Sequence, residues 1–150
     1  MTLLEELMVN LTSQKNQITN YKASVNTILT SCCTKKDALE SVSGPSDLVL
    51  KMISECSHEE TVLTTILQER TDIETSIDGI LALSSGDQVI LGEILNLLVD
   101  MPSLLENVQN ALINSGFDRL KTEYQTCVAG AIPSDVTIMI LQSCITSMLN

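Results

Sequence analysis

Apolar residues recur at alternating steps of three and four along most of residues 4–80. In the first half these positions are Leu4, Leu7, Leu11, Gln14, Ile18, Tyr21, Val25, Ile28 and Cys32, with Gln14 as the one polar member. The same spacing continues through Lys35 to Leu39 and Val42. In the second half they are Val49, Met52, Cys56, Glu59, Leu63, Ile66, Arg70, Ile73, Ile77 and Ile80. Such heptad spacing, sustained over many turns, is typical of long helices that pack side by side.

The pair Gly44-Pro45 separates the two runs and predicts a sharp turn between them. Residues 3–83 are therefore expected to form one long antiparallel helical hairpin. Thr2 and Glu5 are spaced as a capping box, which predicts the start of the first helix near residue 3. The poor helix formers within 31–37 could break this helix, but the uninterrupted heptad favours a single helix to about residue 42.

A third apolar run begins at Asp87 and is hydrophobic on more than one face, as in the central helix of a bundle. Pro102 lies inside this run, where it either kinks one helix or occupies the first turn of a new one. The run offers more apolar surface than one hairpin can cover, so part of it is our candidate interaction surface. Its residues are Leu91, Ile94, Leu98, Met101, Leu105 and Val108.

The rest of the chain has two further apolar runs, the first following the C-cap signal at Gly116 and the second spanning 136–149. Residues 87–149 are thus predicted to form the C-terminal helices. The fold class is all-α: an elongated helical bundle of four to six helices, built on the antiparallel hairpin, as a single domain over 1–150. Two helices of about 38 residues would each span about 57 Å.

Composition narrows the range of partners. The formal net charge is −11, and no Lys or Arg lies between Arg70 and Arg119, so a nucleic-acid phosphate backbone would be repelled. No stretch approaches 18 consecutive apolar residues, which argues against a membrane span. The expected partner is another protein or a second copy of this chain.

The five cysteines suggest two disulfide bonds. Around a turn at Gly44-Pro45, an antiparallel hairpin places Cys33 opposite Cys56, with Cys32 one residue away, so the first candidate pair is Cys33–Cys56 or Cys32–Cys56. The turn predicted near Pro133 brings Cys127 close to Cys144. The alternative is free thiols buried as small apolar groups. Paired cysteines would indicate a secreted protein, and free cysteines a cytoplasmic one.

Motifs for catalysis and for cofactor binding are missing from the sequence. His58 is the only histidine, and it belongs to no His-Glu-x-x-His or Gly-x-Ser-x-Gly pattern. The six glycines form no phosphate-binding loop, and the cysteines lack Cys-x-x-Cys spacing. We therefore expect no enzyme activity, no cofactor and no metal site.

Three functional hypotheses are compatible with this pattern. The first is a non-enzymatic interaction or structural protein that self-associates or docks a partner through apolar helix faces. The second is a carrier that encloses a lipid or another apolar small molecule between its helices. The third is a secreted, disulfide-stapled effector or inhibitor that binds a basic target through the acidic 71–118 segment.

Overall fold

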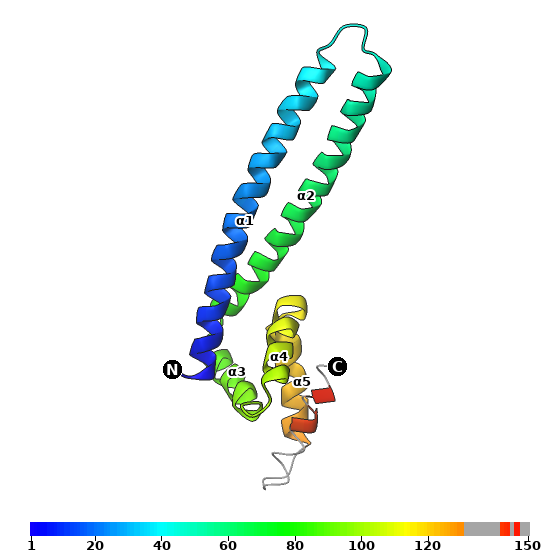
Figure 1. The fold of residues 1–150 in the computed structure, drawn as a ribbon. Coiled ribbons are helices and arrows are strands. Elements are labelled where there is room, and N and C mark those ends of the chain that lie inside the picture. The colour runs from blue at the N-terminus through cyan, green and yellow to red at the C-terminus, as the bar shows by residue number, and fades with distance from the viewer. Residues whose placement is uncertain (131–141, 145, 148–150) are drawn as a thin grey trace. The chain divides into compact units, whose positions relative to one another are not determined.

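The computed structural model describes residues 1–130, 142–144, 146 and 147, and in these residues the ordered elements are helices (Figure 1). They are α1 (Leu3–Glu40), α2 (Asp47–Leu81), α3 (Ser85–Leu97), α4 (Pro102–Ser115) and α5 (Phe117–Ala129). No strand occurs in this part of the chain. The predicted all-α class is confirmed.

Helix α1 runs without a break over 38 residues, about 57 Å at 1.5 Å per residue. It begins at the predicted capping box: the Thr2 amide donates to Glu5 Oε2 at 3.0 Å, and the Glu5 amide donates to Thr2 Oγ1 at 3.1 Å. Residues 31–37 continue the helix because the apolar face of this stretch packs against α2, which outweighs their weak helix propensity.

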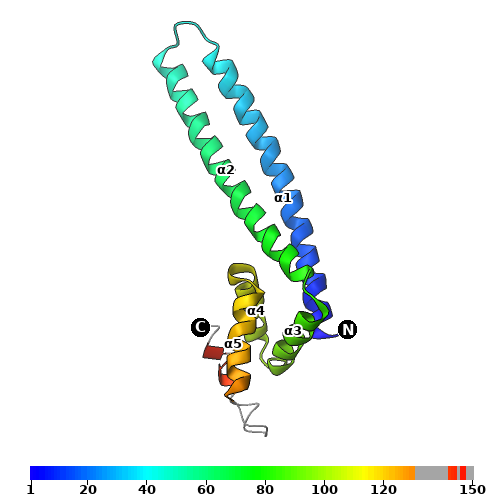
Figure 2. The same ribbon diagram turned by 180° about the vertical axis from the view of Figure 1, so that it is seen from behind.

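A short turn reverses the chain between α1 and α2, and the two helices run side by side in both views (Figures 1 and 2). Gly44 adopts a φ of 60°, a left-handed conformation that glycine reaches without a side-chain clash. Ser46 then caps α2 by accepting a hydrogen bond from the Val49 amide at 3.3 Å. The predicted long antiparallel hairpin is confirmed.

The chain divides into two compact units, and both long helices run from one unit into the other. Unit 1 consists of Met1–Gln14 and Thr75–Asn150, and unit 2 consists of Lys15–Glu74. Unit 2 therefore holds most of the hairpin and its turn. A single domain over the whole chain stays a prediction.

Within unit 1, α5 packs against α3 and α4. Pro102 begins α4 instead of kinking a longer helix, which settles the two alternatives drawn from the sequence. The predicted C-cap is present at Gly116, whose φ of 80° ends α4 and redirects the chain into α5. Among the described residues of this unit, the buried side chains are Leu7, Leu11, Ile77, Ile80, Leu91, Ile94, Leu95, Leu98, Val108, Leu112, Phe117, Leu120, Tyr124 and Cys127.

The candidate interaction surface predicted for the third apolar run is largely inside unit 1. Leu91, Ile94, Leu98 and Val108 are fully buried, and Met101 and Leu105 are half-buried. The correction has a simple cause: α3 and α4 are separate helices, and α5 folds back against both. The surplus apolar area is covered by the chain itself.

The helix predicted for 136–149 falls mostly outside the described residues. Those of its residues that are described, 142–144 with 146 and 147, are helical. They are joined to α5 by the predicted Cys127–Cys144 disulfide, with Cα atoms 6.2 Å apart. The Gln142 amide also donates a hydrogen bond to the Leu97 carbonyl oxygen at 2.8 Å.

Candidate functional site

The stripe of α1 that faces α2 in unit 2 differs partly from the stripe predicted by the sequence. Ile18, Val25, Cys32 and Leu39 face inward as predicted. The second set of inward positions consists of Lys22, Leu29 and Lys36, whereas the prediction placed Tyr21, Ile28 and Lys35 there. Tyr21 is 45% exposed and Ile28 is 50% exposed. This set is thus shifted by one residue, which moves two apolar side chains to the surface.

Helix α2 shows the same shift. Cys56 and Leu63 keep the predicted inward orientation. Met52 and Glu59 were also predicted to face inward, but they are exposed. The residues that follow them, Ile53 and Glu60, are more buried. Arg70, also predicted to face α1, is exposed, and its guanidinium lies 5.1 Å from the centre of the Tyr21 ring. The two helices therefore contact each other through charged as well as apolar positions.

Two ion pairs join α1 and α2 along one side of unit 2. Lys22 Nζ lies 2.7 Å from Glu74 Oε1, and Lys36 Nζ lies 3.2 Å from Glu60 Oε2. The two lysines are two heptads apart, as are the two glutamates, so the same contact repeats along the hairpin. All four side chains are mostly shielded from solvent. Repeated charged contacts of this kind define the register of paired helices. We call this side the ion-pair side.

Three free thiols lie close to the Lys36–Glu60 pair, and the bridge predicted between Cys33 (or Cys32) and Cys56 is not formed. The Cys33 thiol instead donates a hydrogen bond to Glu60 Oε1 at 2.9 Å. Cys32 is the inward-facing residue of the vicinal pair, and its thiol donates to the Cys56 carbonyl oxygen at 3.3 Å. Consecutive helical residues point about 100° apart, which directs Cys33 away from Cys56.

The same contacts shift the ionisation of this cluster. The hydrogen bond to Glu60, with burial adding to it, raises the pKa of the Cys33 thiol from 9.0 to about 11. Burial raises the pKa of Cys32. The hydrogen bonds from Cys33 and Lys36 lower the pKa of Glu60 from 4.5, so its stabilising contribution is present above pH 4.5 and is lost as pH falls through the lowered value. Thiols with raised pKa values are poor nucleophiles at neutral pH.

Replacing Glu60 by glutamine should make Cys33 more reactive. At pH 8 a thiol with a pKa of about 11 has about a hundredfold less thiolate than one with a pKa of 9.0, so we expect slow alkylation in the wild type. Glu60→Gln removes the acceptor carboxylate and should raise the rate by more than about tenfold. The rate of reaction with iodoacetamide can be followed by mass spectrometry in a Cys32→Ala, Cys56→Ala background.

The control for that experiment is Glu69→Gln, which removes an exposed carboxylate elsewhere on α2. It should leave the rate of Cys33 alkylation unchanged. A Cys33 rate that does not respond to Glu60→Gln would contradict the thiol–carboxylate contact.

The opposite side of unit 2 has an open groove between the helices. Its volume is about 460 Å³, and its lining is Lys35, Ala38, Leu39, Met52, Glu55, Cys56 and Glu59. Two heptads from Lys35, a smaller groove of about 190 Å³ is lined by Gln17, Ile18, Tyr21 and Arg70. Ile28 lies on the same stripe of α1 between the two. We call the surface formed by these two grooves and Ile28 the groove side of the hairpin.

Charges on the groove side are nearly balanced. It carries the cations Lys35 and Arg70 together with the carboxylates Glu55 and Glu59. On the ion-pair side the lysines are engaged across the hairpin, but no ion pair is formed by Lys35 with any residue that the structure describes. The groove side therefore combines half-exposed apolar residues with two cations and two carboxylates.

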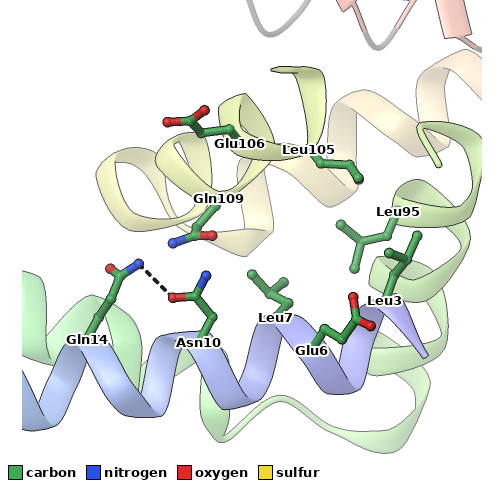
Figure 3. Close-up of a pocket in the computed structure, with 9 residues that line it drawn as sticks. All are labelled: Leu3, Glu6, Leu7, Asn10, Gln14, Leu95, Leu105, Glu106 and Gln109. Carbon is green, nitrogen blue, oxygen red and sulfur yellow. Dashed lines mark hydrogen bonds between the residues drawn. The ribbon is translucent and has the colours of Figure 1, made fainter. Parts of the chain in front are cut away.

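Unit 1 contains a third groove, of about 430 Å³ (Figure 3). Its apolar end is formed by Leu3, Leu7, Leu95 and Leu105, and its polar end by the amides Asn10, Gln14 and Gln109, with Glu6 and Glu106 completing the lining. Gln14 donates a hydrogen bond to Asn10 Oδ1 at 3.1 Å. Every lining residue belongs to unit 1.

A separate polar contact in unit 1 holds α5 to α3. The Tyr124 hydroxyl donates to Glu93 Oε2 at 3.2 Å, at the edge of a groove of about 480 Å³ that also includes Asp100 and Gln142. Burial, followed by the charge of Glu93, raises the pKa of Tyr124. The four grooves thus all contain charged or amide side chains.

Within the part of the chain that the structure describes, no group of three or more His, Cys, Asp or Glu side chains is placed to hold a metal ion. His58 lies exposed on α2. No single described helix is long and apolar enough to cross a membrane; α2 and α3 meet such a test only when taken together as a bent pair.

Comparison of the chain with protein-family models, curated proteins and solved structures found no match.

Proposed function

We propose that this chain is a non-enzymatic interaction protein that self-associates through the groove side of its hairpin. Two hairpins packed by these sides form an antiparallel arrangement of four helices, in which the apolar stripe of each copy covers that of the other. The occupant of the groove side is thus a second copy of this chain.

One observation carries the proposal: half-exposed apolar side chains occur at heptad spacing on the side of the hairpin that lacks the cross-helix ion pairs. Tyr21 and Ile28 are one heptad apart on α1, and Met52, 43% exposed, lies at the groove on α2. Apolar residues with this spacing form the contacts between helices in bundles. In this structure the three side chains are exposed to solvent, whereas in a packed bundle they would contact further helices.

The charge of the groove side is compatible with a second copy of this chain as its occupant. Two chains of formal charge −11 repel each other over most of their surfaces. The groove side is an exception, since its two cations, Lys35 and Arg70, offset Glu55 and Glu59. In a symmetric pair, the cations of one copy have carboxylates of the other copy available to them, which lowers the repulsion where the apolar residues meet.

Ile28→Glu tests the proposal by placing a charge in the middle of the apolar stripe. We expect the wild type to show twice the chain mass of 16.3 kDa in light scattering at micromolar concentration. The variant should need a concentration more than about tenfold higher to associate, because its pairing would bury two unpaired carboxylates. Ile28 is half-exposed, so the hairpin itself should stay folded, which far-UV circular dichroism can verify.

The matched control is Leu50→Glu, an aliphatic residue of almost equal exposure, 51%, on α2 but outside the groove side. It introduces the same charge and should leave the association unchanged. A wild type that remains monomeric, or equal effects of the two variants, would overturn self-association through the groove side.

A further inference from the structure

The groove of unit 1 has an electrostatic character unlike that of the groove side of the hairpin. Its lining contains Glu6 and Glu106 and no basic residue. Unit 1 as a whole carries ten acidic and two basic side chains. Both basic side chains are already engaged, Arg119 with Glu123 at 3.4 Å and Lys121 with Asp87 at 2.9 Å. A ligand in this groove therefore experiences a negative potential that neither basic side chain of the unit neutralises.

The groove is also long and divided into two ends. Along α1 its lining comprises Leu3, Glu6, Leu7, Asn10 and Gln14, one face of the helix over three turns, about 17 Å at 1.5 Å per residue. The leucines gather at one end and the amides at the other (Figure 3). This length and polarity fit a helix that presents residues at i, i+3, i+4 and i+7, the usual mode by which an amphipathic helix enters a groove.

We propose that this groove binds a basic amphipathic helix of a partner protein. The apolar residues of that helix pack on Leu3, Leu7 and Leu105, and its Lys or Arg side chains pair with Glu6 and Glu106. The inference is independent of self-association, because it concerns a different unit and different residues.

The amides at the polar end complete the recognition. Asn10 accepts from Gln14, which leaves the Asn10 amide nitrogen, the Gln14 carbonyl oxygen and the whole Gln109 amide to bond with polar groups of the bound helix. Hydrogen bonds to such donors and acceptors fix the orientation of the bound helix more than they raise its affinity.

Binding of a defined probe tests the inference. The probe is a fluorescently labelled 14-residue helical peptide of leucine and lysine, and its counterpart of leucine and glutamate is the control. Fluorescence anisotropy with the full chain should show saturable binding of the basic peptide and none of the acidic one. The double variant Glu6→Gln, Glu106→Gln should weaken binding by about five- to tenfold, as expected for the loss of two partly screened charge pairs.

Two further variants separate groove binding from general attraction to an acidic protein. Glu40→Gln, Glu69→Gln removes the same amount of charge from exposed sites of unit 2 and should change affinity less than about twofold. Leu105→Gln keeps the charge but removes an apolar wall, and should weaken binding by more than about threefold.

Equal losses from the two double variants, or an unchanged affinity in Leu105→Gln, would overturn the inference in favour of non-specific charge attraction. The Ile28→Glu protein serves as a reference for independence. It should bind the basic peptide with the affinity of the wild type whether or not it still self-associates.

Discussion

Replacement of Leu112 by alanine should lower the free energy of unfolding of unit 1 by about 2–5 kcal/mol. Leu112 is fully buried in α4, a helix that packs against α5. Alanine has the higher helix propensity of the two, so the loss comes from apolar contact and from the cavity left behind, and α4 itself should persist. Urea denaturation followed by tyrosine fluorescence measures the change.

The two tyrosines allow the units to be observed separately, because Tyr124 belongs to unit 1 and Tyr21 to unit 2. In a Tyr21→Phe background the signal reports unit 1 alone. Leu50→Ala, at an exposed position of α2, is the control and should cost less than about 0.5 kcal/mol. A loss below about 1 kcal/mol for Leu112→Ala would mean that α4 is not packed as the structure shows.

Removing the Cys127–Cys144 disulfide should have the second large effect. The bridge joins residues 17 apart in sequence, and closing a loop of this size reduces the entropy of the unfolded chain by the equivalent of about 3 kcal/mol. The Cys127→Ser, Cys144→Ser variant should therefore lose about this much stability in unit 1. Its stability should also no longer respond to a reducing agent, whereas that of the wild type should fall on reduction.

The free thiols provide the control for the disulfide experiment. Cys32→Ser, Cys56→Ser changes two cysteines of unit 2 that form no bridge in this structure, and it should leave the response of unit 1 to reduction intact. Intact mass before and after reduction counts the bridges directly. Five alkylatable thiols in the unreduced protein would contradict the Cys127–Cys144 bond.

The hairpin could be predicted from the sequence because its signals are local. The heptad pattern, the Thr2–Glu5 capping box and Gly44 at the turn each operate within a few residues, and the structure contains the two long helices, the cap and the turn that they predict. The position of Pro102 in a first turn was likewise one of two outcomes that local chemistry allows.

The rotation of each helix about its axis could not be predicted in the same way. Some positions of each helix face the other helix both in the prediction and in the structure. The seven-residue repeat allows a second inward stripe on either side of these positions. On α1 the more apolar of the two alternative stripes contains Tyr21 and Ile28. The structure turns the other stripe inward because Lys22 and Lys36 find carboxylates on α2. The inward stripe of α1 therefore depends on glutamates of α2 that lie about 24 to 52 positions away from the lysines in sequence. A pattern within one helix does not include them.

Prediction of the candidate sites from the sequence was limited by the same dependence on helix rotation. Cys127–Cys144 was predicted correctly because the two cysteines are only 17 residues apart in the sequence. The Cys33–Cys56 pairing depended on helix rotation, which instead brings Cys33 to Glu60. The burial of the third apolar run could not be predicted, because the sequence did not show that α5 packs against α3 and α4.

The repetition of one ion pair after two heptads makes the hairpin modular in length. Deleting residues 23–29 together with 61–67 would remove seven residues from each arm while retaining both lysine–glutamate partnerships in their present register. Each such excision shortens the hairpin by about 10 Å, and a matched insertion lengthens it equally. The hairpin can thus serve as an adjustable spacer. The distance from its base to its turn can be altered without redesigning the contacts that align α1 with α2.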